Sequence, residues 1–457
     1  MSELNTASRA AAEKLERYIL ETTWEDLPDI VKERAKTCTV DLFDVMIACS
    51  HTHMAKAGIR LAEDVFACGS IPIVGTSSRL NLMGAVTAYG YNINALDVDD
   101  GHNMIKGHPG AVLMAGLWPT ALMVGATYRE FLTALVIGYE VSIRAGLALH
   151  KYYGFYHGTG SWGAFGVAAG MARLLKLDRE TLANALGIAD YQGPLAPIMR
   201  IVEIPSMNKD GIAWGAITGA MAVEAARKGI TGQFYNLLEP ENQPLINTLG
   251  QDYEIMNIYF KYFPSCRWAQ PAIVSALELR EKHMLKAEEI ERIFIKTFKA
   301  ATKLSSVTPV HCDDAQYNMV YPVCAALIEG KFTPVEVSEE YLACHPEVVA
   351  LMSCVEFTVD PELEALFPRK RFARLEVVKK NGERLLSAMN EPLGEQEHQV
   401  DLAWVTRKFR DVSGHCFSVQ AQDRLISMLA DSSYARPLED LVEFVNRNND
   451  YYITVAT

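Results

Sequence analysis

Helical periodicity dominates roughly the first 260 residues of the chain. Residues 9–22 and 29–49 place apolar side chains three and four positions apart, the period of an amphipathic helix. Thr127-Tyr-Arg-Glu130 has the form of a capping box and predicts a helix that begins there. Residues 163–175 and 212–228 contain many Gly and Ala, so we expect two helices whose backbones lie close to their neighbours.

Strand patterns become clear only after about residue 285. Residues 292–298 and 354–359 are rich in β-forming side chains. Two further candidate strands, 372–379 and 383–388, flank Asn381-Gly382, a strong hairpin signal. Helical periodicity then returns in three segments, over residues 398–411, 416–430 and 437–447.

This order of elements predicts a mainly α fold with two domains. A chain of 457 residues is longer than the roughly 250–300 residues at which single cores stop growing. We expect a large all-helical domain from residues 1–268 together with 398–457. A smaller α+β domain, residues 269–397, would be inserted before the C-terminal helices.

Net charge and hydropathy narrow the function classes. The chain has 43 Lys and Arg against 56 Asp and Glu, a formal charge of −13, which argues against nucleic-acid and anionic-membrane partners. Residues 1–9 are polar and lack the pattern of a signal peptide. The apolar stretch 111–126 is shorter than the ~20 residues of a membrane span, so we expect a buried helix.

The nine cysteines are scattered without a C-x-x-C pair. Such spacing is typical of reduced thiols in a cytoplasmic protein, and we expect a cytoplasmic location.

Acidic and imidazole side chains cluster between residues 97 and 108, and these are Asp97, Asp99, Asp100, His102 and His108. The segment is also rich in turn-forming residues, so a solvated loop with helix caps is an equal alternative. A metal site is a weaker interpretation, because no fixed ligand spacing is met. The pair His51 and His53 is equally weak as a metal site.

Residues 158–163, Gly-Thr-Gly-Ser-Trp-Gly, match the dinucleotide fingerprint G-x-G-x-x-G. The fingerprint requires a buried strand before it, but residues 151–156 are aromatic and contain glycine. We therefore reject a nicotinamide oxidoreductase. The turn instead predicts a helix N-terminus able to bind a carboxylate, with His157 at its mouth, although Thr159 or Ser161 could simply cap the helix.

Basic side chains occur in two further segments. Lys209 precedes a helix rich in small residues, where a lysine usually extends to solvent. Lys261 and Arg267 surround a Pro-Ser turn and favour a binding site, because Arg binds carboxylates through two parallel hydrogen bonds.

Taken in order, these motifs resemble the MmgE/PrpD family, which includes 2-methylcitrate dehydratase, cis-aconitate decarboxylase and iminodisuccinate epimerase. The residues that carry the resemblance are Leu96-Asp-Val-Asp-Asp100, Gly107-His-Pro-Gly110, His157-Gly-Thr-Gly-Ser161, Ala185-Leu-Gly-Ile-Ala189, Lys209 and Lys261-Tyr-Phe-Pro264. The resemblance runs over essentially the whole chain.

The resemblance implies a homodimeric enzyme that needs no metal or organic cofactor and binds a small polycarboxylate between its domains. The active-site positions that it implies are Asp97, His108, His157, Lys209 and Lys261. We expect the substrate to be bound by Arg267, Gly158, Thr159, Gly160 and Gln270.

Three departures from the family pattern leave the substrate open. Gly101 stands where related dehydratases and decarboxylases often have Thr, and Gln270 replaces a frequent His. After His108 the chain reads Pro-Gly-Ala, whereas 2-methylcitrate dehydratases typically have Pro-Ser-Asp-Asn.

The family's reactions share a carbanion-like centre beside a carboxylate, which requires a positioned base and nearby cations. We expect His108 and His157 to transfer protons and Asp97 to orient His108. Lys209, Lys261 and Arg267 would neutralise substrate carboxylates.

We predict a lyase of dehydratase or decarboxylase type that acts on a hydroxy-di- or tricarboxylate. The alternative is an epimerase of an amino- or imino-dicarboxylate such as iminodisuccinate. A catalytically inactive binding or scaffold protein is the alternative of another class, but a scaffold has no need of buried lysines and histidines.

Overall fold

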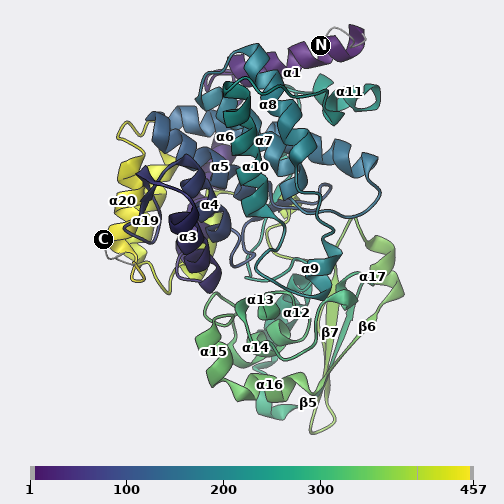
Figure 1. The fold of residues 1–457 in the computed structure, drawn as a ribbon. Helices are drawn as coiled ribbons and strands as arrows, with labels where there is room; N and C mark the ends of the chain where they lie inside the picture. The colour runs from purple at the N-terminus through teal and green to yellow at the C-terminus, as the bar shows by residue number, and fades with distance from the viewer. Residues whose placement is uncertain (1–5, 399, 453–457) are drawn as a thin grey trace.

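Long helices form one half of the molecule, and a four-stranded sheet with shorter helices forms the other (Figure 1). The computed structural model describes residues 6–398 and 400–452. The predicted mainly α fold with a smaller α+β part is confirmed. The domain boundaries after residues 268 and 397, and the homodimer, stay predictions.

The helical half begins with helices α1 (Thr6–Glu21), α2 (Asp29–Cys49), α3 (His53–Val65), α4 (Leu82–Asn92), α5 (Pro109–Val124), α6 (Tyr128–Tyr152), α7 (Gly160–Leu174), α8 (Arg179–Gln192), α10 (Ile212–Arg227) and α11 (Gln243–Asn247). The C-terminal helices complete it, and they are α18 (Leu402–Val412), α19 (Val419–Ala430) and α20 (Glu439–Asn448). The predicted capping box at Thr127 and Glu130 is present at the start of α6.

The α+β half contains strands β5 (Ile290–Thr297), β6 (Val355–Val359), β7 (Ala373–Lys379) and β8 (Arg384–Leu386). Its helices are α12 (Gln270–His283), α13 (Cys312–Gln316), α14 (Tyr321–Glu329), α15 (Glu339–Cys344), α16 (Pro346–Met352) and α17 (Pro361–Leu366). The short helix α9 (Met199–Glu203) lies beside them (Figure 1).

The four-stranded sheet has the order β6-β5-β7-β8. β5 pairs in parallel with β6 and antiparallel with β7, and β7 continues antiparallel into β8. The turn at Asn381-Gly382 joins β7 to β8, with a φ of +86° at Gly382 that favours glycine. The predicted hairpin is therefore confirmed.

Two apolar helices run through the interior of the helical half. All residues of α5 from Pro109 to Ala121 are buried, which confirms the helix expected over 111–126 and its burial as far as Ala121, while Met123 and Val124 are exposed. α6 is the one helix in the described ranges that is long and apolar enough to cross a membrane, yet 89% of its apolar window is buried. Such burial is typical of the core helix of a globular protein.

Small residues let α7 and α10 pack at close range, as their composition predicts. A Cβ on Gly215 would lie 2.5 Å from the Cα of Gly160, and one on Gly219 would lie 2.5 Å from the carbonyl oxygen of Ala164. Only glycine fits at these contacts, and the close packing fixes where α7 begins.

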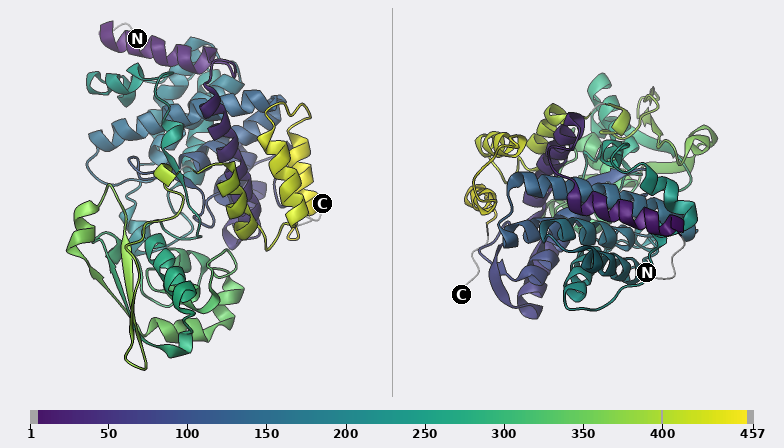
Figure 2. Two further views of the ribbon diagram at one scale, coloured as in Figure 1. Left: turned by 180° about the vertical axis from the view of Figure 1, so that it is seen from behind. Right: turned by 90° about the horizontal axis from the view of Figure 1, so that it is seen from above.

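The C-terminal helices fold back onto the start of the chain, where α18 and α19 pack against α2 (Figure 2). The ammonium of Lys408 on α18 lies 2.6 Å from a carboxylate oxygen of Asp41 on α2, and both side chains are fully buried. This ion pair ties segments that are 367 residues apart.

Two strand pairs were not predicted from the sequence. β1 (Cys68–Pro72) pairs with β2 (Arg79–Leu80). β3 (Asp100–His102) pairs antiparallel with β4 (Ile258–Phe260), so that Gly101 lies opposite Tyr259. The second pair brings the acidic segment beside Lys261 and thereby sets up the site described next.

Candidate active site

A cavity of about 210 Å³ is lined by four of the residues that the sequence singled out, and these are Asp97, His108, Lys261 and Arg267. The basic, acidic and imidazole side chains of its lining are Lys106, Lys261, Arg267, Arg371, Asp97, Asp210 and His108. Apolar and aromatic side chains, among them Ile198, Met199, Trp268 and Phe367, complete it. Lysine and arginine thus outnumber the carboxylates of the lining two to one.

The β3–β4 pair places Lys261 against Asp97. Asp97 lies just before β3 with a φ of +50°, and Lys261 directly follows β4. The Lys261 ammonium donates to a carboxylate oxygen of Asp97 at 2.5 Å, and both side chains are buried. Burial alone would lower the pKa of Lys261, but the carboxylates of Asp97 and Asp99 outweigh it and raise that pKa. Lys261 is therefore a fixed positive charge.

His108 precedes the first turn of α5, and Asp99 holds its imidazole. Nδ1 of His108 lies 2.9 Å from a carboxylate oxygen of Asp99, whose other oxygen accepts a hydrogen bond from the Asn94 amide at 2.7 Å. Burial and Lys261 act to lower the pKa of His108, but Asp99 and Asp210 outweigh them and raise it to about 9. The ring is therefore an imidazolium at neutral pH.

The carboxylate that orients His108 differs from the one expected. The sequence analysis assigned this role to Asp97, but Asp97 is bound to Lys261 and lies 3.7 Å from Nε2 of His108. Asp99 takes the role because its carboxylate lies at Nδ1 of His108, whereas the carboxylate of Asp97 is held by the Lys261 ammonium, and the sequence pattern revealed neither contact.

Asp210 is a cavity residue that the sequence analysis missed. One carboxylate oxygen lies 3.5 Å from Nε2 of His108, and the other is buried without a hydrogen-bond partner among the described residues. Burial raises the pKa of Asp210, although His108 lowers it in part. The signal available in the sequence was only its position next to Lys209.

Lys209 points away from this cavity. Its backbone has a φ of +42°, and the following Gly211 has a φ of +72°, so consecutive side chains of this turn leave in different directions. The Lys209 ammonium donates to the carbonyl oxygens of Asn94 and Ala95 and to the side chain of Gln316. Lys209 therefore holds the chain that leads to Asp97 and does not line the cavity.

The glycine-rich turn of residues 158–160, where α7 begins, makes hydrogen bonds to the backbone of His108 and Asp210. The Gly160 N–H donates to the carbonyl oxygen of Asp210, and the Gly158 N–H donates to that of Ala196. The Thr159 hydroxyl oxygen accepts from the backbone N–H of His108 at 3.0 Å. These groups position the cavity residues, and none of the three lines the cavity.

His157 is fully buried at the same turn but is not part of the cavity lining. Its Nδ1 lies 2.7 Å from the Ser161 hydroxyl, and its Nε2 has no hydrogen-bond partner within the described ranges. The ring centroid lies 4.1 Å from that of His150. Burial lowers the pKa of His157, so the ring is neutral at pH 7.

Arg267 and Gln270 have different places. Arg267 lines the cavity, pairs with Glu395 at 2.6 Å and lies over the Tyr259 ring, with its guanidinium carbon 3.8 Å from the centroid. Gln270 is fully buried outside the lining, where its amide donates to the carbonyl oxygens of Phe263 and Ser265. Gln270 therefore shapes the turn that presents Arg267.

Gly101 is required by the ring of Tyr259. A Cβ at Gly101 would lie 2.3 Å from that ring, so the Thr expected from the family resemblance would require the ring to move. The ring of Tyr259 lines the cavity.

Asp97, Asp99 and His108 each offer a ligand atom within 4.8 Å of the others. The Lys261 ammonium and the imidazolium of His108 already supply positive charge to these carboxylates. The group therefore balances its charge through protein side chains.

Comparisons with known proteins cover most of the chain. The family model of the MmgE/PrpD N-terminal domain matches residues 13–254, and that of the MmgE/PrpD C-terminal domain matches residues 263–433. The chain is also similar to a cis-aconitate decarboxylase-like protein, oryM, from Aspergillus oryzae, with 26% identity over 225 residues. That match covers 47% of this chain and 46% of the relative, about half the length of each.

Proposed function

Because the chain belongs to the MmgE/PrpD family, we propose that it is a lyase acting on a small hydroxy-di- or tricarboxylate. The reaction passes through a carbanion-like centre next to a carboxylate, formed by removal of a proton in a dehydration or by loss of CO₂ in a decarboxylation, and it needs no cofactor. Dehydration and decarboxylation are the two forms of this reaction. The similarity to a protein named as decarboxylase-like supports decarboxylation as one of them.

The charge of the cavity is the observation that carries this proposal. Lys106, Lys261, Arg267 and Arg371 surround two carboxylates and an imidazolium. Such a lining attracts a ligand with several carboxylates and stabilises the negative charge that develops on proton removal. The volume of about 210 Å³ lies below the roughly 300–1,000 Å³ of drug-sized ligand sites, which favours a small metabolite.

We assign the acid to His108 and the base to Asp210. At neutral pH His108 carries the proton that an acid must deliver, because Asp99 and Asp210 raise its pKa to about 9. Asp210 is a stronger base than an ordinary carboxylate, because burial raises its pKa. Asp210 thus takes the role expected of His157, since Asp210 lines the cavity and His157 does not.

In a dehydration, Asp210 would accept the carbon-bound proton, and the electrons of that C–H bond would form the double bond as hydroxide leaves. His108 would protonate the leaving hydroxide to water. In a decarboxylation, the electrons of the broken C–C bond would form the carbanion, and His108 would protonate it after CO₂ departs. Lys261 and Arg267 would hold the substrate carboxylates.

The test is incubation in D₂O with citrate, methylcitrate, aconitate, malate, tartrate and iminodisuccinate, followed by proton NMR and CO₂ detection. A vinyl product or CO₂ release supports the lyase. Deuterium incorporation without elimination identifies the epimerase instead. If no compound reacts or exchanges a proton, the proposed substrate class is refuted.

Variants separate the two candidate bases. Asp210→Asn should abolish turnover or exchange, whereas His157→Gln should retain part of it, because only Asp210 faces the cavity. Circular dichroism and thermal melting would confirm that both variants fold. The reverse pattern in folded protein would assign the role of the base to His157.

A further inference from the structure

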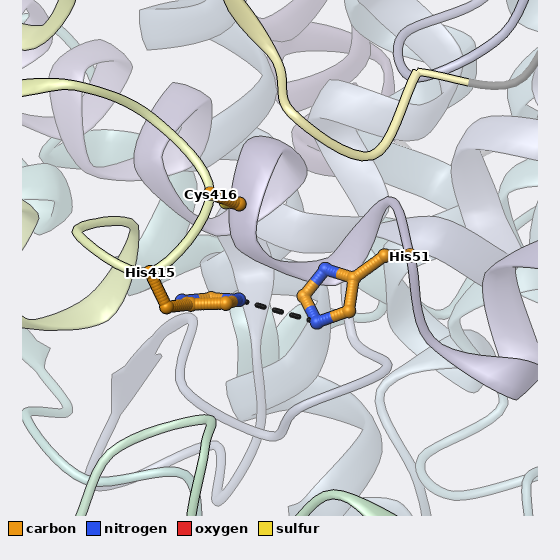
Figure 3. Close-up of side chains that lie close together, drawn as sticks. All are labelled: His51, His415 and Cys416. Atoms are coloured by element: carbon orange, nitrogen blue, oxygen red, sulfur yellow. Dashed lines mark hydrogen bonds between the residues drawn. The ribbon is translucent and has the colours of Figure 1, made fainter.

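A second cluster of ligand-type side chains lies away from the cavity described above. His51 belongs to the turn between α2 and α3, and His415 and Cys416 belong to the loop between α18 and α19. One ring nitrogen of each histidine and Sγ of Cys416 lie within 4.8 Å of one another. Figure 3 shows the two imidazoles tilted to each other with their Nε2 atoms joined by a dashed line, and these two atoms lie 3.2 Å apart.

The hydrogen bonds of this pair leave one nitrogen unsatisfied. Nδ1 of His415 lies 3.0 Å from the carbonyl oxygen of Val412, which can only accept, so Nδ1 carries the hydrogen. In the neutral ring, Nε2 of His415 is then a lone pair directed at His51. Nδ1 of His51 is buried and has no partner in the part of the chain that the structure describes.

Neither tautomer of His51 resolves this arrangement. With the hydrogen on Nε2, the two rings bond but the buried Nδ1 lone pair of His51 has no donor. With the hydrogen on Nδ1, two lone pairs face each other at 3.2 Å. A cation bound between the Nε2 atoms would accept both of these lone pairs, whereas a proton would accept only one. The hydrogen of His51 would then lie on Nδ1, which has no partner among the described residues.

The geometry also fits a metal. Zinc–nitrogen bonds of about 2.0–2.1 Å at a tetrahedral angle place two nitrogens about 3.3 Å apart, close to the 3.2 Å found between the two rings. The bond from Nδ1 of His415 to the Val412 carbonyl is the partner that a ligating histidine commonly has, because it fixes the tautomer and the ring direction.

Cys416 offers a third ligand atom, and a cavity beside the two histidines gives access to solvent. Cys416 is buried next to His415, and its thiol would lose a proton to solvent as it binds the metal. His51 and His415 line a cavity of about 720 Å³, through which an ion can enter and a water can reach the fourth position.

We propose that His51, His415 and Cys416 bind a divalent transition-metal ion of the zinc type. The ion would join the α2–α3 turn to the α18–α19 loop, which are 364 residues apart in sequence. Tyr451 stacks on His51 with its centroid 4.5 Å away, so the ion would also steady the C-terminal segment. The site is separate from the proposed catalytic residues.

The test uses the full chain, treated with a chelator and then titrated with Zn²⁺ by calorimetry in a Cys68→Ser/Cys344→Ser background, because these two thiols are exposed. We expect one Zn²⁺ per chain and a rise in the melting temperature. Co²⁺ in place of Zn²⁺ should give the near-ultraviolet absorption of a metal–thiolate bond, which Cys416→Ser removes.

His415→Ala should weaken Zn²⁺ binding at least tenfold. His345→Ala is the matched control, because His345 lines the same cavity but lies outside the cluster, and it should bind Zn²⁺ normally. His51→Gln provides a second variant if His415→Ala does not fold. Absence of stoichiometric binding, or binding that survives His415→Ala and His51→Gln, overturns the proposal.

The same titration distinguishes this site from the cluster of Asp97, Asp99 and His108. If Asp99→Asn abolished Zn²⁺ binding and His415→Ala did not, the ion would bind at Asp97, Asp99 and His108 and the proposal would be refuted.

Discussion

The hydrogen bond between Asp99 and His108 leads to a quantitative prediction of the pKa of His108 in the variant Asp99→Asn. The asparagine keeps the shape of the side chain and can still accept from the Asn94 amide, but it removes the negative charge 2.9 Å from Nδ1 of His108. Its own amide hydrogens would face Nδ1, which must then carry a lone pair. Burial and Lys261, both of which lower the pKa of His108, would then be opposed chiefly by Asp210.

The size of the effect follows from the pKa of His108. A rise from 6.5 to about 9, at about 1.4 kcal/mol per pKa unit, corresponds to roughly 3 kcal/mol of favourable interaction with the protonated ring. The folded pKa exceeds the unfolded one, so this stabilisation is complete below pH 6.5 and is lost as the pH rises through about 9. Asp99→Asn should therefore lower the free energy of unfolding more at pH 6 than above pH 9.

The assay is an NMR titration of the ring nitrogens in ¹⁵N-histidine-labelled protein, with urea unfolding at several pH values. The pKa of His108 should fall from about 9 toward or below 6.5 in Asp99→Asn. Activity that depends on His108 as an acid should decline at correspondingly lower pH.

Asp100→Asn is the matched control. Asp100 is equally buried and accepts hydrogen bonds from the Gly110 N–H and the Tyr139 hydroxyl, but it makes no hydrogen bond to His108. Its replacement should leave the pKa of His108 in place. An unchanged His108 titration in Asp99→Asn, or an equal change in Asp100→Asn, would show that our account of the imidazolium is wrong.

Three further predictions concern packing and buried charge. Lys209→Met should lower the free energy of unfolding by about 3–5 kcal/mol in urea titrations, because it leaves Asp313 and three hydrogen-bond acceptors without their partner. An inactive variant of unchanged stability would contradict this structural role. Gly101→Thr should cost about 1–3 kcal/mol through its clash with Tyr259, and a double-mutant cycle with Tyr259→Ala should recover much of it; additive effects would refute the clash. Lys408→Met should cost about 3–5 kcal/mol by leaving the Asp41 carboxylate unpaired, and the double variant with Asp41→Leu should be more stable than Lys408→Met alone in thermal melts.

Local patterns in the sequence were sufficient for most of the fold. Apolar side chains at helical spacing predicted α2 and the C-terminal helices, and Asn381-Gly382 predicted the β7–β8 hairpin. These signals are local, because helix periodicity and turn chemistry depend on residues a few positions apart. The β3–β4 pair was not predicted, since each strand is only three residues long and its partner lies more than 150 residues away.

The candidate site was predicted in part. Asp97, His108, Lys261 and Arg267 were named from the sequence and line one cavity in the structure. Their catalytic and binding roles stay predictions, as do those of His157 and Lys209, which the structure places outside the lining.

Residue type and order along the chain thus determined the family, the helical architecture and the presence of a cationic site. The tertiary structure alone decided that Asp99 holds His108, that Asp210 faces the cavity and that Lys209 turns away from it. The physical reason is that a side chain's direction depends on backbone angles such as the positive φ at Lys209 and on pairing with distant strands. Likewise, Gly101 was an unexplained departure until the ring of Tyr259 was seen to occupy its space.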